Sequence, residues 1–301
     1  MPAKILITGG TGFIGSEITR HALAAGHQVA TVVRDPEKLP QDSRLISIRG
    51  DLSRLDWRAI ENFCPTICLH CAWIATPGVY QTSPANADYR DWSIRLAERL
   101  YGNGLEKFIG LGTCLEYASS SQALDENSLR PAKPSPYTLA KLAVLDALKA
   151  MAPSPQAWAW MRVFYAYGSG EHPQRFLSSA IRELSQGKSL ILRRPDDVVD
   201  YIHVKDIASA TFAAMDPAAS GIFNVGSGRG QTVAEVARIA ASMCGAEGQL
   251  EFDHPADAES RFASIRRLQN YKWKPQYAFE NGLEEIVASV RGSLHHSQSS
   301  Q

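Results

Sequence analysis

The sequence predicts an α/β protein: a doubly wound parallel sheet with a smaller, mixed α/β lobe in the C-terminal part of the chain. Short apolar runs rich in branched residues alternate with amphipathic helical patterns over the first ~160 residues. This alternation is typical of parallel strands joined by right-handed helical crossovers, with helices on both faces of the sheet. The second half has more breaker residues, which indicates a differently organised lobe.

The expected elements are apolar or periodic segments that end at turn residues such as Gly26, Gly50 and Gly102. In the first half we expect strands at residues 4–7, 28–33, 45–48, 66–71, 108–112 and 158–163, and helices at 16–25, 53–63, 86–101 and 136–151. In the second half we expect helices at 174–186, 207–215 and 232–244, and strands at 190–192, 200–204 and 222–225. Asp206 is expected to be the N-cap of the helix that follows it. The polar end, 293–301, is expected to be disordered.

The composition excludes several classes of protein. The chain has 301 residues, 45% of them hydrophobic and 21% charged, which is enough for a large core and two lobes. Lys+Arg and Asp+Glu both number 31, so we expect no nucleic-acid partner and no anionic membrane partner. The apolar runs are too short to span a bilayer and no secretory signal is visible, so a cytoplasmic location is expected.

The five cysteines are scattered along the chain, which fits a reducing compartment rather than a disulfide framework. Cys68 and Cys71 form a C-x-x-C pair, but no second pair exists to complete a zinc site. We therefore expect both to be small core residues, and we expect no metal.

The glycine-rich turn from Thr8 to Gly15 lies between the first strand and the first helix. Gly9 allows a sharp turn, Gly12 leaves room for a pyrophosphate against bare backbone, and Gly15 lets the helix pack close to the strand. The spacing is G-x-x-G-x-x-G, and the flanking strand and helix favour a dinucleotide-binding (Rossmann) crossover over a plain turn.

Tyr137 and Lys141 lie four residues apart at the start of a predicted helix, so they share one face of it. A nearby ammonium favours the phenolate and so lowers the pKa of a tyrosine, as acid–base work near neutral pH requires. Thr113 ends the fifth predicted strand, where its hydroxyl can bond the same substrate oxygen as the tyrosine.

Six separated motifs now resemble, in order and spacing, those of the extended short-chain dehydrogenases, the NAD-dependent epimerase/dehydratase family, whose members typically act on nucleotide sugars. The motifs are Thr8–Gly15, Asp51-Leu52, Thr113, Tyr137 with Lys141, Asp200–Asp206 and Phe223–Gly226. The resemblance extends from residue 4 to about 290.

The resemblance implies a role for each matching residue. Thr113, Tyr137 and Lys141 would form the catalytic triad. The cofactor would be bound by residues of the glycine turn, of two later strand ends and by the triad lysine: Gly9, Gly12, Phe13, Ile14, Gly15, Asp51, Leu52, Ala72 and Lys141. Residues 1–165 would form the dinucleotide-binding domain, with 196–224 returning to it. Residues 166–195 and 225–292 would form the substrate-binding lobe.

The choice of cofactor depends on the end of the second strand. An acid there bonds the adenosine ribose and selects NAD, whereas an arginine accommodates the extra phosphate of NADP. Arg34 and Asp35 are both present, but the strand ends in Val32-Val33 and Arg34 comes first. We therefore expect NADP, with NAD as the alternative.

Two departures from the family pattern concern the reaction and the sixth strand. Dehydratases of the family typically have the sequence Thr-Asp-Glu at the end of the fifth strand. Here Cys114 and Leu115 follow Thr113, and Glu116, one residue further on, is expected to point away from the substrate. Dehydration is therefore disfavoured. Tyr165 replaces the asparagine that usually follows the sixth strand.

A third departure concerns the substrate diphosphate. Val199 stands where many members place an arginine that clamps it. Arg175, or Arg193 and Arg194, would replace this arginine, or they are surface residues. Trp73 and Tyr80 follow the fourth strand and could pack on a sugar or nicotinamide ring, or simply pack within the loop. Cys114 is a further candidate at the substrate.

The leading hypothesis is an enzyme that uses NADPH to reduce a keto group of a nucleotide-activated deoxysugar, with Tyr137 as proton donor. A nucleotide-sugar epimerase with retained NAD is the close alternative. A reductase of a non-sugar carbonyl remains possible because of Val199 and Tyr165. A cofactor-binding sensor without turnover is the alternative from another class. The resemblance also suggests a homodimer packed through helices 86–101 and 136–151.

Overall fold

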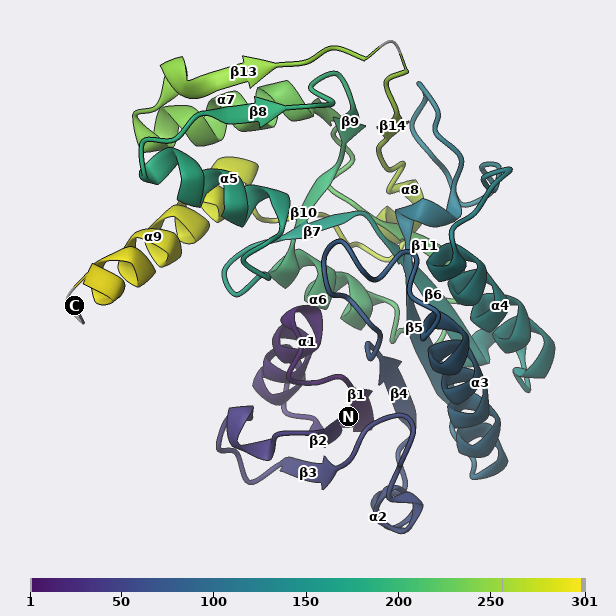
Figure 1. Ribbon diagram of the computed structural model, residues 1–301. Helices are drawn as coiled ribbons and strands as arrows, with labels where there is room; N and C mark the ends of the chain where they lie inside the picture. The colour runs from purple at the N-terminus through teal and green to yellow at the C-terminus, as the bar shows by residue number, and fades with distance from the viewer. Residues whose placement is uncertain (1, 256, 299–301) are drawn as a thin grey trace.

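A seven-stranded parallel sheet forms the centre of the protein, as the alternating pattern predicts (Figure 1). The computed structural model describes residues 2–255 and 257–298. From one edge to the other, the strands are β11 (Gly221–Val225), β6 (Trp158–Val163), β5 (Lys107–Thr113), β4 (Ile67–His70), β1 (Lys4–Thr8), β2 (Gln28–Val33) and β3 (Leu45–Arg49). The order reverses between β1 and β4, so the carboxyl ends of these two strands form the position where ligands bind in such sheets.

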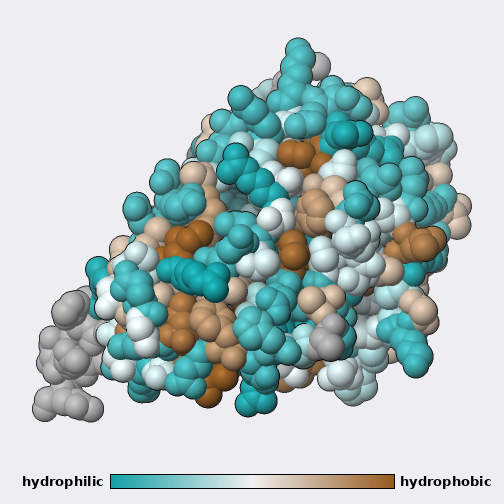
Figure 2. Space-filling view, turned by 90° about the horizontal axis from the view of Figure 1, so that it is seen from above, coloured by the Kyte–Doolittle hydropathy of each residue, from teal (hydrophilic) through white to brown (hydrophobic). Residues whose placement is uncertain are grey.

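Helices cover both faces of the sheet. One face is covered by α1 (Phe13–Ala24) and α6 (Val204–Ala213), which contact each other, and the other by α2 (Trp57–Phe63), α3 (Asn86–Gly102) and α4 (Pro136–Met151). Alternate residues of each central strand point to opposite faces, so the strands bury apolar side chains on both sides. Figure 2, which looks down on the molecule from above, shows apolar residues as separate patches among hydrophilic ones on that face.

The remaining elements lie beside the carboxyl ends of the strands (Figure 1). The strands form short ladders: β7 (Tyr165–Tyr167) with β10 (Tyr201–His203), β8 (Leu190–Leu192) with β13 (Leu250–Phe252), and β9 (Val198–Val199) with both β12 (Gln231–Thr232) and β14 (Ser260–Arg261). The helices are α5 (Phe176–Ser185), α7 (Val233–Cys244), α8 (Arg266–Gln269) and α9 (Phe279–Gln298). Buried side chains of α5, α7 and α9 share one apolar cluster.

Three expectations about helices are wrong. The helix expected from residue 53 begins only at Trp57, because Asp51 and Arg54 form a β-bridge and Asp56 is the N-cap. His203, rather than Asp206, caps α6, and the buried Asp206 carboxylate instead accepts the backbone N–H groups of Gln276 and Tyr277. The polar C-terminal segment is helical as far as Gln298, as part of α9, while residues 299–301 lie outside the described range.

One further expectation about the second half needs correction. The strand expected at 200–204 is shorter, β10 (Tyr201–His203), and neither β7 nor β9, which ends at Val199, was expected. Ala263, Leu268 and Trp273 of the predicted substrate lobe belong to the same buried apolar cluster as residues of the central sheet. The exact division of the chain into a cofactor domain and a substrate lobe stays a prediction.

Candidate active site

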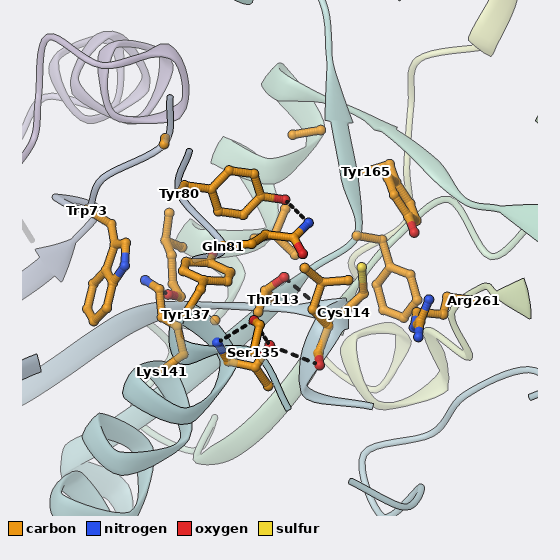
Figure 3. A pocket seen from close by; sticks show the side chains of 18 of the residues that line it. Trp73, Tyr80, Gln81, Thr113, Cys114, Ser135, Tyr137, Lys141, Tyr165 and Arg261 are labelled. Carbon is orange, nitrogen blue, oxygen red and sulfur yellow. Dashed lines mark hydrogen bonds between the residues drawn. The ribbon is translucent and has the colours of Figure 1, made fainter. Parts of the chain in front are cut away.

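A cavity of about 470 Å³ opens at the carboxyl ends of β4, β5 and β6 (Figure 3). Its wall combines residues from the end of β5, the loop after β4, the first turns of α4 and the segments around β7, α5 and β14. Trp73 and Lys141 lie toward one end of the cavity, and Tyr165 and Arg261 toward the other. The sheet and the C-terminal segments thus meet at one site.

The structure brings Thr113, Tyr137 and Lys141 to the same cavity. Thr113 is the last residue of β5, and its hydroxyl accepts the backbone N–H of Leu115 at 3.2 Å. Tyr137 and Lys141 lie one turn apart on α4, which begins at Pro136 after the N-cap Ser135. The fixed φ of proline and the capping hydroxyl explain why the helix begins there.

Lys141 is almost fully buried and has two partners. Its Nζ donates a hydrogen bond of 2.7 Å to the carbonyl oxygen of Leu111 and lies 3.8 Å from the ring centroid of Trp73. Burial lowers the pKa of Lys141 to about 7, while the charge of Glu116 acts in the opposite direction. Lys141 therefore changes charge close to neutral pH.

Tyr137 lies against two aromatic rings. Its ring centroid is 4.9 Å from that of Tyr80 and 6.2 Å from that of Trp73, both edge-on. Burial raises the pKa of the Tyr137 phenol, and the nearby hydroxyl of Thr113 opposes this only in part. The expectation that Lys141 lowers the pKa of Tyr137 is not met here, because the effect of burial on the phenol dominates. Tyr137 is accordingly a neutral phenol, the form that donates a proton.

The loop after β4 carries Trp73 and Tyr80 into the cavity wall, and the buried Asn86 holds this loop in place. The side-chain oxygen of Asn86 accepts the indole N–H of Trp73 at 2.9 Å, and its amide group donates to the carbonyl oxygens of Tyr80 and Ser83. Sequence reasoning missed Asn86. The only feature of the sequence that could have indicated it is an amide side chain at the first residue of a helix, directly after a polar loop.

Two arginines also line the cavity. Arg175 lines it, lies 5.9 Å from the ring centroid of Tyr80, and has no ion pair among the described residues. Arg261, which sequence reasoning missed, lines it too and pairs with Glu259. In the pairing of β14 with β9, Arg261 lies opposite Val199. Val199 is the position at which many family members have an arginine.

Two further substrate candidates, Cys114 and Tyr165, line the cavity as well. Arg194 does not line it, because its guanidinium pairs with Asp197 at 2.7 Å and with Asp257 at 3.5 Å outside the cavity. Arg194 is therefore one of the surface arginines.

The glycine turn fits a dinucleotide. Gly9 adopts φ +72°, and a Cβ on it would come within 2.9 Å of Ala72. A Cβ on Gly15 would overlap the carbonyl oxygen of Gly9. Gly12 is the N-cap of α1 and provides no side-chain cap, so the first N–H groups of the helix are left for an external acceptor such as a pyrophosphate.

The other predicted cofactor residues are close to this turn or at the ends of neighbouring strands. Phe13 and Ile14 open α1, and Ile14 also lines the cavity. Arg34 is exposed directly after β2 and has no hydrogen bond or ion pair among the described residues. The Asp51 carboxylate accepts the hydroxyl of Ser53 and, in addition, the backbone N–H groups of Ser53 and Arg54, which lowers its pKa. Leu52 is buried.

Several candidates are structural. Glu116 points away from the cavity and bonds Arg162, as expected from its place one residue beyond the dehydratase pattern. His203 is buried, caps α6 and stacks on Tyr277. Cys68 is a core residue as expected, but Cys71 lines the cavity. Among the described residues, no group of three acidic, His or Cys side chains could hold a metal ion, and no helix is long and apolar enough to span a membrane.

A dinucleotide-binding sheet with a threonine, a tyrosine and a lysine at its carboxyl edge defines an oxidoreductase of the extended short-chain dehydrogenase type. Residues 5–226 match the NAD dependent epimerase/dehydratase family, and the chain belongs to this family.

Its relatives have different activities. The chain is 26% identical to UDP-glucose 4-epimerase 4 of Oryza sativa subsp. japonica, with 92% of this chain and 87% of that protein aligned. It is 24% identical to UDP-glucuronic acid decarboxylase 1 of Xenopus tropicalis, with 99% and 74% aligned. Among solved structures, MoeE5 in complex with UDP-glucose and NAD is 27% identical and superimposes with a TM-score of 0.80 over 97% of this chain and 99% of MoeE5.

Proposed function

We propose that this protein reduces a keto group of a nucleotide-activated deoxysugar, with NADPH as the preferred cofactor. Two observations carry this: Thr113, Tyr137 and Lys141 converge in the cavity without a carboxylate from the two residues after Thr113, and Arg34 is exposed at the end of β2. Dehydration requires acids at those positions in the family pattern. Redox chemistry at a carbon that bears oxygen requires only the three residues that are present.

Each residue has a role that follows from its surroundings. The neutral phenol of Tyr137 donates a proton to the carbonyl oxygen of the substrate, and the Thr113 hydroxyl orients that oxygen. Lys141 holds the cofactor ribose and, when charged, favours the phenolate that remains after proton transfer. When bound, the nicotinamide supplies the hydride.

The two arginines of the cavity wall support a diphosphate-bearing substrate. Among the described residues Arg175 makes no ion pair, and Arg261 pairs with the half-exposed Glu259. Guanidinium groups bind phosphate oxygens through paired hydrogen bonds. Sugars also pack readily on aromatic faces such as those of Trp73 and Tyr80. The bound UDP-glucose of MoeE5, which has the same fold, supports the same substrate class.

The preference for NADPH depends on Arg34. This arginine is exposed at the end of β2, where an extra adenosine phosphate would lie, and it makes no hydrogen bond or ion pair within the described part of the chain, whereas Asp35 pairs with Lys38 at 3.3 Å. We expect Arg34→Ser to weaken NADPH binding by ~10- to 100-fold, the value of one or two charge-assisted hydrogen bonds, and to leave NADH binding unchanged. Arg44→Ser, which removes an exposed arginine paired with Asp42, is the matched control.

A nucleotide-sugar 4-epimerase is the second candidate, and the relationship to UDP-glucose 4-epimerase 4 favours it. The same three residues can remove a proton from a hydroxyl and return it, so the cavity does not distinguish the two reactions. An epimerase retains its cofactor because the hydride is given back to the same sugar, while a reductase must exchange it after each turnover.

The purified protein distinguishes these candidates. It would be denatured and any released nucleotide identified, and the cofactor-free protein would be titrated with NADPH and NADH. Turnover would then be followed with NADPH and a UDP- or dTDP-linked 4-keto-6-deoxyhexose, and separately with UDP-glucose and NAD. Stoichiometric released NAD and interconversion of UDP-glucose would overturn the reductase assignment. Binding of cofactor with no turnover of these or of simple carbonyl substrates would favour the sensor.

We also propose that the protein is a homodimer that packs through α3 and α4. These helices pack side by side on one face of the sheet, and Leu139 of α4 is 54% exposed although it is apolar. Light scattering would show a mass of about twice 32.9 kDa. Leu139→Glu should shift that mass to the monomer value if the proposed surface is correct.

A further inference from the structure

A buried carboxylate lies directly behind the active-site threonine. Glu116 has no exposed surface, and it accepts the backbone N–H of Thr113 at 3.0 Å. The Thr113 hydroxyl in turn accepts the N–H of Leu115, so Thr113 and Glu116 form a reciprocal capping box around one short turn. Both the backbone and the hydroxyl of Thr113 are thereby fixed at the edge of the cavity.

Two residues of β6 also donate hydrogen bonds to the Glu116 carboxylate. It accepts the indole N–H of Trp160 at 3.0 Å and the Nε–H of Arg162 at 2.7 Å. The Arg162 side chain is only 3% exposed, and its guanidinium also lies 4.2 Å from the ring of Tyr117. Burial of an ion pair is costly unless further hydrogen bonds satisfy it. Here Glu116 accepts three donors, and Arg162 also donates to the carbonyl oxygen of Glu126 at 3.2 Å.

The central strand makes room for this pair. In the register of β5 and β6, Gly110 faces Trp160 and Gly112 faces Arg162. A Cβ on Gly112 would overlap the indole nitrogen of Trp160 and would lie 2.5 Å from a carboxylate oxygen of Glu116. Glycines weaken a strand interior, and these two leave the space that the Trp160 indole and the Glu116 carboxylate occupy.

The same carboxylate acts on the active-site lysine. Lys141 donates to Leu111, two residues before Thr113, and its Nζ is 5.9 Å from the ring centroid of Trp160, whose indole N–H is bound by Glu116. Burial lowers the pKa of Lys141, and Glu116 is the largest influence that raises it again. The other titratable groups facing Lys141 are Cys71, His70 and, on its own helix, Tyr137.

We propose that the buried Glu116–Arg162 pair is a positioning element of this active site: Glu116 fixes the backbone of Thr113 and places a negative charge behind Lys141. Glu116 itself does not line the cavity. This inference rests on the roles proposed for Thr113 and Lys141, but its first test does not require the substrate.

The test follows the titration of Lys141 by NMR in protein carrying ¹³C-labelled lysine, with the resonance assigned by its loss in Lys141→Met. In Glu116→Gln we expect the pH midpoint of the Lys141 titration to move to lower pH, because a nearby negative charge that favours the ammonium form is removed. Glu116→Asp keeps the charge, so its midpoint should stay near that of the wild type. Asp206→Asn removes a buried carboxylate that also accepts two backbone N–H groups, but outside the cavity, and it should leave the midpoint unchanged.

Turnover with the keto-sugar probe tests the positioning of Thr113. The aspartate side chain in Glu116→Asp is too short to keep the hydrogen bond to the Thr113 N–H, so kcat should fall by ~10- to 100-fold, with KM for the cofactor little changed.

If Glu116→Gln does not fold, the double variant Glu116→Gln/Arg162→Met takes its place in the NMR test. This variant removes both charges, and removal of a whole buried pair is better tolerated than removal of one partner. Glu116 is the charge that raises the pKa of Lys141 most, so the titration midpoint should still fall, but by less than in Glu116→Gln, because the opposing charge of Arg162 is removed as well. An unchanged midpoint in the folded variant would overturn the proposal, even if the protein proved to be an epimerase.

Discussion

Lys141 is expected to reduce the stability of the protein at neutral pH. Burial lowers its pKa from 10.5 to about 7 in the folded state. Between these two pH values the unfolded chain holds a proton on Lys141 that the folded protein has released. The free energy of unfolding therefore rises with pH across this window, and the stability is lost again as the pH falls through 7.

The size of this effect follows from the shift. Each pH unit contributes ~1.4 kcal/mol once the folded form is neutral, and somewhat less near pH 7, where Lys141 is half protonated. Between pH 7 and pH 9 the contribution of Lys141 is thus about 2 kcal/mol. Lys141→Met keeps the length of the side chain without its charge, so this variant should lack the rise.

Urea unfolding at pH 7, 8 and 9 measures the effect as a difference between the wild type and Lys141→Met. Lys149→Met, which changes an exposed lysine on the same helix, is the control and should follow the wild type. Lys141→Met should also lose most activity. If the difference between the wild type and Lys141→Met did not change with pH, Lys141 would not be a desolvated amine, and the electrostatic reasoning about this site would be refuted.

Three further changes test other parts of the site. Tyr137→Phe should lower kcat by ~10²- to 10⁴-fold, because it removes the proton donor, while the cofactor affinity measured by fluorescence titration stays nearly constant; retained activity would mean that another group donates the proton. Gly15→Ala should abolish cofactor binding and destabilise the fold by ~1–3 kcal/mol, because the new Cβ overlaps the Gly9 carbonyl; calorimetry would contradict this if binding were normal. Asn86→Ala should cost about 2 kcal/mol in urea unfolding and raise KM for substrate, because the loop that carries Trp73 loses three side-chain hydrogen bonds; an unchanged KM would separate the loop from substrate binding.

The order and type of the central elements could be predicted because the signals are local. A buried parallel strand is a short run of branched apolar residues, and α4 and β6 occur over the ranges that the pattern predicts. Helix starts were less predictable, because the cap depends on distant partners. Asp206 has the sequence of an N-cap, but its carboxylate is used by the backbone of Gln276 and Tyr277, 70 residues later.

Some residues of the candidate site could likewise be predicted from the sequence and others could not. The glycine turn and the Tyr137–Lys141 pair were visible in the sequence, because both depend on spacing within one element. Arg261 and Asn86 were not, because their relevance comes from contacts between segments far apart in the chain: Arg261 lies beside Val199 only through the pairing of β14 with β9, and Asn86 is defined by the loop that it holds.

The sequence by itself therefore determined the family, the sheet and the three residues that we propose to carry out the chemistry, because these reside in short motifs with fixed spacing. The protonation of those residues was decided only by the tertiary structure. Spacing predicts that a lysine acidifies its tyrosine, but in the folded protein burial dominates: it raises the pKa of Tyr137 and lowers that of Lys141. Desolvation depends on everything packed around a group, and the carboxylate that opposes it at Lys141 comes from a turn 25 residues earlier, Glu116.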